Sequence, residues 1–81
     1  MTTRTVTLEC STDPSLIGDA ATEDDLDNYH ANLAALIERE FGVIVLRVKV
    51  SGRDDCRESE EIHARIREIE SGDEWLQLLT N

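Results

Sequence analysis

Basic residues are scarce in this chain of 81 residues, which has 8 Lys and Arg against 18 Asp and Glu. Lys49 is the only lysine, and no basic residue lies between Arg4 and Arg39. Proteins that bind nucleic acids need clustered Lys and Arg to neutralise phosphates, so this composition argues against a nucleic acid as the partner. Anionic membrane surfaces should repel the chain for the same reason.

Long apolar runs are absent as well. No run approaches the ~20 apolar residues that cross a bilayer. Residues 1–10 alternate polar and apolar side chains and do not form the apolar centre of a signal peptide. We therefore expect a soluble, cytoplasmic protein without a membrane partner. Its length predicts a single domain over residues 1–81.

Metal ligands and nucleophiles are few and widely spaced. Cys10 and Cys56 are 46 positions apart, and His30 and His63 are 33 apart, which does not match a zinc site. Glu60 and His63 have the spacing of one half of a di-iron site, but the second half is missing. Four scattered glycines form no phosphate-binding loop. We expect reduced thiols, no metal or other cofactor, and no enzymatic activity.

Hydrophobic periodicity predicts a β-α-β-α-α order. Strands are expected over residues 3–10 and 43–51, and helices over residues 22–41, 56–70 and 74–80. A strand-helix-strand unit of this length implies two parallel strands joined by a right-handed crossover. We predict an α+β fold with a small two-stranded sheet that helices cover on one face. Either a monomer or a weak homodimer paired through sheet edges is compatible with this fold.

The alternation of side chains predicts which face of each strand is buried. The first strand turns Val6, Leu8 and Cys10 to one face. The second strand has four aliphatic residues on one face: Ile44, Leu46, Val48 and Val50. We expect the helices to cover this face, which would leave Arg47 and Lys49 on the outer face of the sheet, beside Glu9.

The segment 22–41 has the signals of a capped, amphipathic helix. Thr22 can cap its start, with Asp25 completing a capping-box pair, and Gly42 follows its end. Asp24 and Asp27 point away from the apolar stripe. The stripe has helical spacing and consists of Leu26, Tyr29, Leu33, Leu36, Ile37 and Phe41.

Acidity is the most distinctive property of the chain, whose net charge is −10. We predict two sets of partner-binding residues. The first set surrounds the start of the first helix and consists of Asp19, Glu23, Asp24, Asp25 and Asp27. The second set consists of Asp54, Asp55, Glu58, Glu60 and Glu61. Carboxylates three or four residues apart on a helix are about 5–6 Å apart, which is of the order of the phosphate spacing in DNA. Such an array could occupy the basic groove of a nucleic-acid-binding protein complex.

The small size, the acidity, and the segments TEDDLDNYH (22–30) and EREFG (38–42) resemble small proteins encoded by phages and prophages. These include anti-CRISPR proteins that act as DNA mimics. The resemblance implies an inhibitor that works in the cytoplasm of a host cell and blocks the target-DNA site of a CRISPR surveillance complex. It assigns no functional residue. Two alternatives stay open: a small acidic structural or interaction domain adapted to salt, and an antitoxin-like partner of a basic protein.

Overall fold

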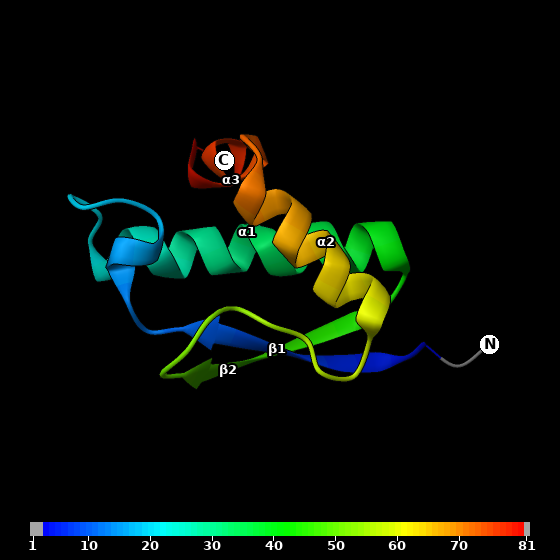
Figure 1. Cartoon of the computed structure of the whole chain (residues 1–81). Coiled ribbons are helices and arrows are strands. Elements are labelled where there is room, and N and C mark those ends of the chain that lie inside the picture. The colour runs from blue at the N-terminus through cyan, green and yellow to red at the C-terminus, as the bar shows by residue number, and fades with distance from the viewer. Residues whose placement is uncertain (1–2, 81) are drawn as a thin grey trace.

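A computed structural model describes residues 3–80 of the chain (Figure 1). The chain forms β1 (Thr5–Ser11), a short 3-10 helix η1 (Pro14–Leu16), α1 (Glu23–Phe41), β2 (Ile44–Val50), α2 (Glu60–Ser71) and α3 (Glu74–Thr80). The predicted β-α-β-α-α order is therefore confirmed. Helix α2 begins four residues later than predicted, because Ser59 caps it by accepting a hydrogen bond from the Ile62 N–H.

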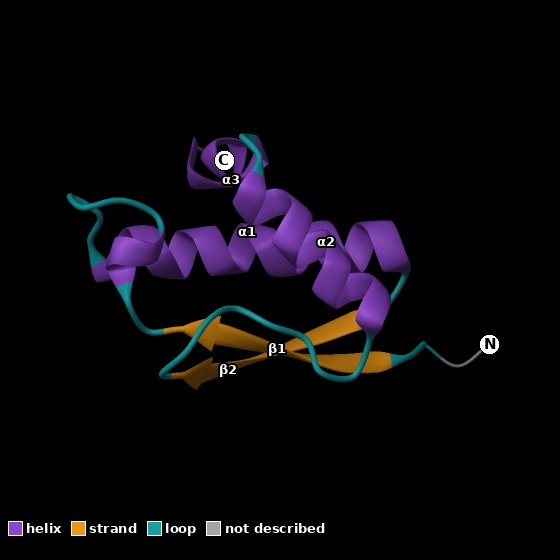
Figure 2. Ribbon diagram, in the orientation of Figure 1, coloured by secondary structure: helices purple, strands orange, loops and turns teal. Residues whose placement is uncertain are grey.

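The two strands form one parallel sheet, and the helices lie on one side of it (Figure 2). The predicted α+β fold with a single covered face is confirmed. The covered face of β1 carries Val6, Leu8 and Cys10, as the alternation predicted. The core between this face and the helices includes Leu26, Tyr29, Leu33 and Ile37 from α1 and Ile62, Ile66 and Ile69 from α2. Burying each of the larger side chains stabilises the fold by about 1.5–3 kcal/mol.

Strand β2 presents the face opposite to the predicted one. Its register with β1 places Val45 beside Val6 and Arg47 beside Leu8, so these residues lie on the helix side. Ile44, Leu46 and Val48 lie on the outer face and are 46, 55 and 43% exposed. The prediction was wrong because both faces of this strand begin with aliphatic residues, so the alternation alone could not choose between them.

The link from α1 to β2 sets the face that β2 buries. Gly42 ends α1 in the left-handed conformation, with φ of 64°, and donates its N–H to the carbonyl of Glu38. The chain leaves this turn with Val43 buried, and Val45 follows it on the same side of the strand. Arg47 therefore falls on the helix side. It does not lie beside Glu9, which pairs with Arg57.

The segment before α2 covers the edge of β1 that faces away from β2. Glu9 and Asp55 exchange two backbone hydrogen bonds of 2.8 and 3.0 Å. A carboxylate oxygen of Glu58 accepts from the Thr7 N–H, and the Arg4 guanidinium donates to the Glu58 carbonyl. Within residues 3–80, no strand pairs with the opposite edge of the sheet, which belongs to β2. Among the helices described, none is long and apolar enough to cross a membrane.

Candidate functional site

The first acidic set lies where α1 begins. The hydroxyl of Thr22 accepts from the Asp25 N–H at 3.2 Å, and the carboxylate of Asp25 accepts from the Thr22 N–H at 3.0 Å. This capping box was predicted and is confirmed. It fixes the first turn of the helix, whose free N–H groups and dipole favour nearby negative charge. Asp25 therefore has a structural role in addition to its charge.

The structure brings the whole first set together at one end of α1. All five side chains are exposed: Asp19, Glu23, Asp24, Asp25 and Asp27. In Figure 1 the loop that carries Asp19 lies beside the start of the helix. None of the ion pairs found within residues 3–80 involves a member of this set. We call this group the α1 acidic surface.

An open groove borders the α1 acidic surface. Glu23 and Asp27 line it from α1, and Arg47 and Lys49 line it from β2. The groove follows from the register of β2, because that register turns both cations to the helix side of the sheet. No ion pair among the described residues involves Arg47 or Lys49. Two cations without an ion pair to a described residue therefore line the same groove as Glu23 and Asp27.

Asp54 is not a surface residue, and its assignment to the second partner-binding set was wrong. Its side chain is 0% exposed. Its Oδ1 atom accepts from the Ser11 N–H at 2.7 Å and lies 2.8 Å from Nε2 of His30, which is also buried. A buried carboxylate needs such partners. Sequence reasoning missed this pair because nothing local links positions that are 24 residues apart.

The other four members of the second set do not form one surface. Asp55 pairs with His63, and this hydrogen bond holds the pKa of Asp55 below its usual value. Glu58 accepts from the backbone of β1. Glu60 and Glu61 are exposed in the first turn of α2. Figure 1 shows this turn near the C-terminal end of α1, away from the α1 acidic surface. The two predicted sets are therefore separate.

Arg65 neutralises much of the acidity on the helical side of the molecule. It forms ion pairs with Glu40, Glu68 and Glu74 at 2.8, 2.6 and 2.7 Å. Hydrogen bonds from its guanidinium lower the pKa of Glu40 and Glu74, and the same bonds raise the pKa of Arg65. The contacts with Glu40 and Glu74 join three helices, and sequence spacing gave no signal for them. Among residues 3–80, eleven exposed carboxylates have no cationic partner, and five of them lie at the start of α1.

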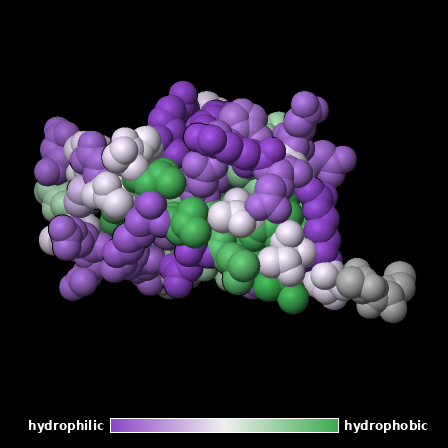
Figure 3. Space-filling model, turned by 90° about the horizontal axis from the view of Figure 1, so that it is seen from below, coloured by the Kyte–Doolittle hydropathy of each residue, from purple (hydrophilic) through white to green (hydrophobic). Residues whose placement is uncertain are grey.

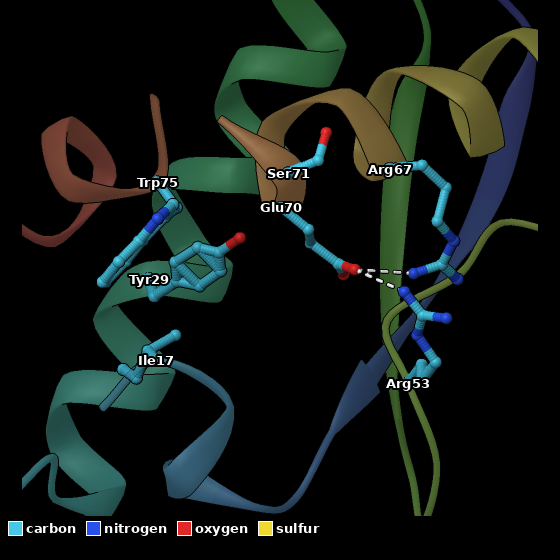
Figure 4. Close-up of a pocket in the computed structure, with 7 residues that line it drawn as sticks. All are labelled: Ile17, Tyr29, Arg53, Arg67, Glu70, Ser71 and Trp75. Carbon is cyan, nitrogen blue, oxygen red and sulfur yellow. Dashed lines mark hydrogen bonds and ion pairs between the residues drawn. The ribbon is translucent and has the colours of Figure 1, made fainter. Parts of the chain in front are cut away.

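A separate cavity of about 270 Å³ lies between α1, α2 and α3, and Ile17 and the loop before α2 also line it (Figure 4). Figure 4 shows Arg53 and Arg67 reaching the same carboxylate, and both donate to Oε2 of Glu70, at 3.1 and 2.7 Å. The two cations thus share one carboxylate, although the Arg53 side chain is 69% exposed. Tyr29 and Trp75 form the opposite wall, and burial raises the pKa of Tyr29. Neither cysteine nor histidine lines this cavity.

Neither thiol is prepared for nucleophilic chemistry. Cys10 and Cys56 are buried and free of disulfide bonds. Burial raises the pKa of Cys10 to about 11 and also raises that of Cys56. Both therefore stay protonated at neutral pH, and a thiol is a weak nucleophile in that form. Across residues 3–80, no three His, Cys, Asp or Glu side chains converge in a way that could hold a metal ion.

No protein-family model, curated protein or solved structure matches this chain.

Proposed function

We propose that this protein is a non-enzymatic inhibitor that mimics DNA and occupies the basic nucleic-acid-binding groove of a protein complex. An anti-CRISPR protein that blocks target-DNA binding by a surveillance complex would act in this way. One observation carries the proposal: five exposed carboxylates without cationic partners gather on the α1 acidic surface, while the six others of this kind among residues 3–80 lie elsewhere on the molecule.

The rigidity of the α1 acidic surface supports this role. Four of its five residues lie in the first two turns of a capped helix, so little conformational freedom is lost on binding. Carboxylates on successive turns are about 5–6 Å apart, which allows several of them to meet a row of Arg and Lys at once. Dense charge of one sign also speeds association with a basic partner, most strongly at low salt.

The elongated shape of the molecule is also compatible with a groove. Its extents are 43, 23 and 20 Å, and the longest is comparable with about twelve base-pair steps of ~3.4 Å each. Glu60 and Glu61, near the other end of α1, are candidates for a second, independent contact. Asp54 is excluded from any contact because it is buried.

A competition experiment tests the proposal. Purified CRISPR surveillance complexes of several types are incubated with labelled target DNA and increasing amounts of the protein. We expect the protein to displace DNA from at least one complex, and more effectively at low than at moderate salt. If a complex binds the protein and DNA at the same time, DNA mimicry is wrong for that complex. If no complex binds the protein, the anti-CRISPR assignment fails.

A matched pair of double variants tests the surface itself. Asp24→Lys with Asp27→Lys should weaken inhibition by orders of magnitude, because it reverses two exposed charges and spares the capping residue Asp25. Glu68→Lys with Asp73→Lys changes the net charge equally at exposed sites outside the surface. It gives up the exposed Glu68–Arg65 ion pair, which contributes less than about 1 kcal/mol to stability, and should weaken inhibition only a few-fold. Circular dichroism verifies that both variants fold. Equal losses would show that net charge matters and that the α1 acidic surface has no special role.

A further inference from the structure

Strand β2 has an open edge and an exposed apolar face. The chain covers the outer edge of β1 but pairs nothing with the far edge of β2 within residues 3–80. Ile44, Leu46 and Val48 are roughly half exposed on the outer face of this strand. Figure 3 views the molecule from that side and shows apolar side chains gathered in a band. Parallel sheets are usually covered on both faces, and an open edge is a template for another strand.

Alternate residues of β2 direct their backbone groups to the open edge. Ile44 donates its N–H to the Arg4 carbonyl, and the Val50 carbonyl accepts from Thr12, so the even-numbered residues point to β1. In a parallel ladder the N–H and C=O of one residue point the same way. Val45 and Arg47 therefore direct theirs outward. The carboxylate of Glu38 accepts from the Val45 N–H at 3.0 Å, which places an acid directly at this edge.

We propose that a second copy of this chain pairs with the edge of β2 and forms a four-stranded sheet around a two-fold axis. A two-fold axis makes the β2 strands antiparallel, so that each contact occurs twice. Residues 41–53 are the longest stretch of the chain without Asp or Glu. The strand itself therefore brings no carboxylates to the interface, although each copy has a net charge of −10; Glu38 reaches this edge from α1.

Charge selects one register for this pairing. If the axis passes through Leu46, Arg47 of each copy lies opposite Val45 of the other copy. The side chain of Arg47 is then within reach of Glu38 of the other copy. If the axis passes through Arg47, the two Arg47 side chains lie opposite each other. If it passes through Val48, Arg47 lies opposite Lys49. Like charges directly opposite destabilise a strand pair, so the register centred on Leu46 is favoured.

The same register makes the apolar faces continuous. Leu46 lies beside Leu46 of the second copy, and Ile44 lies opposite Val48, so all three residues lose exposed area. On the helix side, Ala31 lines the groove beside β2, and Ala35 follows one turn later; both are exposed. These short side chains leave room for α1 of the second copy. Arg and Lys at an edge normally discourage pairing, but here Glu38 of the second copy compensates Arg47.

Charge reversal tests the proposed contact. Sedimentation equilibrium of the wild type should show a monomer-dimer equilibrium. Arg47→Glu and Glu38→Arg should each weaken the dimer by roughly tenfold or more, and the double variant should restore it, because the ion pair is re-formed in the opposite sense. Arg39→Glu is the control: it changes the net charge by the same amount one position away from Glu38 and should alter dimerisation less.

Amide exchange gives a second readout that needs no variant. With increasing concentration of the wild type, the amide of Arg47 should exchange more slowly, because it becomes hydrogen-bonded across the new edge. The Val45 N–H already donates to Glu38 in a single chain and only exchanges this acceptor for one in the second copy, so Arg47 is the informative amide. Three results would overturn the proposal: a monomer at every concentration, a dimer that neither charge reversal affects, or concentration-dependent protection confined to other strands and helices. A fourth result is a dimer that Leu46→Asp abolishes and the charge reversals do not affect. It would indicate that the outer faces of the two sheets stack on each other, and it would overturn edge pairing.

Discussion

Replacing His30 by Leu should destabilise the fold by about 3–5 kcal/mol, because it removes one partner of a buried polar pair. Asp54 is fully buried, and its Oδ1 atom has two partners, the Ser11 N–H and the His30 imidazole. Its Oδ2 atom is buried without a hydrogen bond from any described residue. With the imidazole gone, the carboxylate would keep a single hydrogen bond in an apolar environment.

The size of this effect matters because the domain is small. A domain of 81 residues has a stability on the order of 5 kcal/mol, so the variant should retain only about 0–2 kcal/mol and should be partly unfolded in water at room temperature. Asp54→Asn keeps an oxygen that can accept both hydrogen bonds and removes the charge. It should therefore cost less than His30→Leu, and in the His30→Leu background it should recover part of the loss.

The chain contains a matched control for this experiment. His63 and Asp55 form a second His–Asp pair, but their side chains are 46 and 30% exposed. Water can replace the lost partner there, so His63→Leu should cost less than about 1 kcal/mol. Urea denaturation followed by circular dichroism measures both variants. The reasoning is refuted if His30→Leu lies within about 1 kcal/mol of wild type, or if His63→Leu is the more damaging of the two.

Two further predictions concern the charge of the chain. Added salt should raise the melting temperature, because the Debye length falls from about 30 Å at 0.01 M to about 8 Å at 0.15 M and screens repulsion among the unpaired carboxylates; a flat or falling melting temperature over this range would contradict this. Arg65→Gln should destabilise the protein at neutral pH but not in acid. Arg65 lowers the pKa of Glu40 and Glu74 below their ordinary value of 4.5, so this stabilisation is present above pH 4.5 and is lost as the pH falls through the lowered pKa values. The gap in melting temperature between wild type and variant should close as the pH falls below 4.5, and a constant gap would contradict this.

The sequence by itself determined the features that depend on neighbours along the chain. The order of strands and helices, the apolar stripe of α1, its capping box and its glycine cap all follow from local spacing, and the structure confirms them. The exposure of the α1 acidic surface also follows from local spacing. Asp24 and Asp27 lie on a helix whose buried side was evident from its 3.6-residue period, so their outward direction was determined as well.

Tertiary structure alone decided the features that depend on pairs of residues far apart in the sequence. The register between β1 and β2 placed Arg47 on the helix side and Leu46 on the outer face, a choice that alternation alone could not make. The packing of residues 53–58 along β1 buried Asp54 against His30 and removed it from the predicted surface. A period of two or 3.6 residues fixes which side chains share a face, but which face is buried depends on the strand or helix that packs against it.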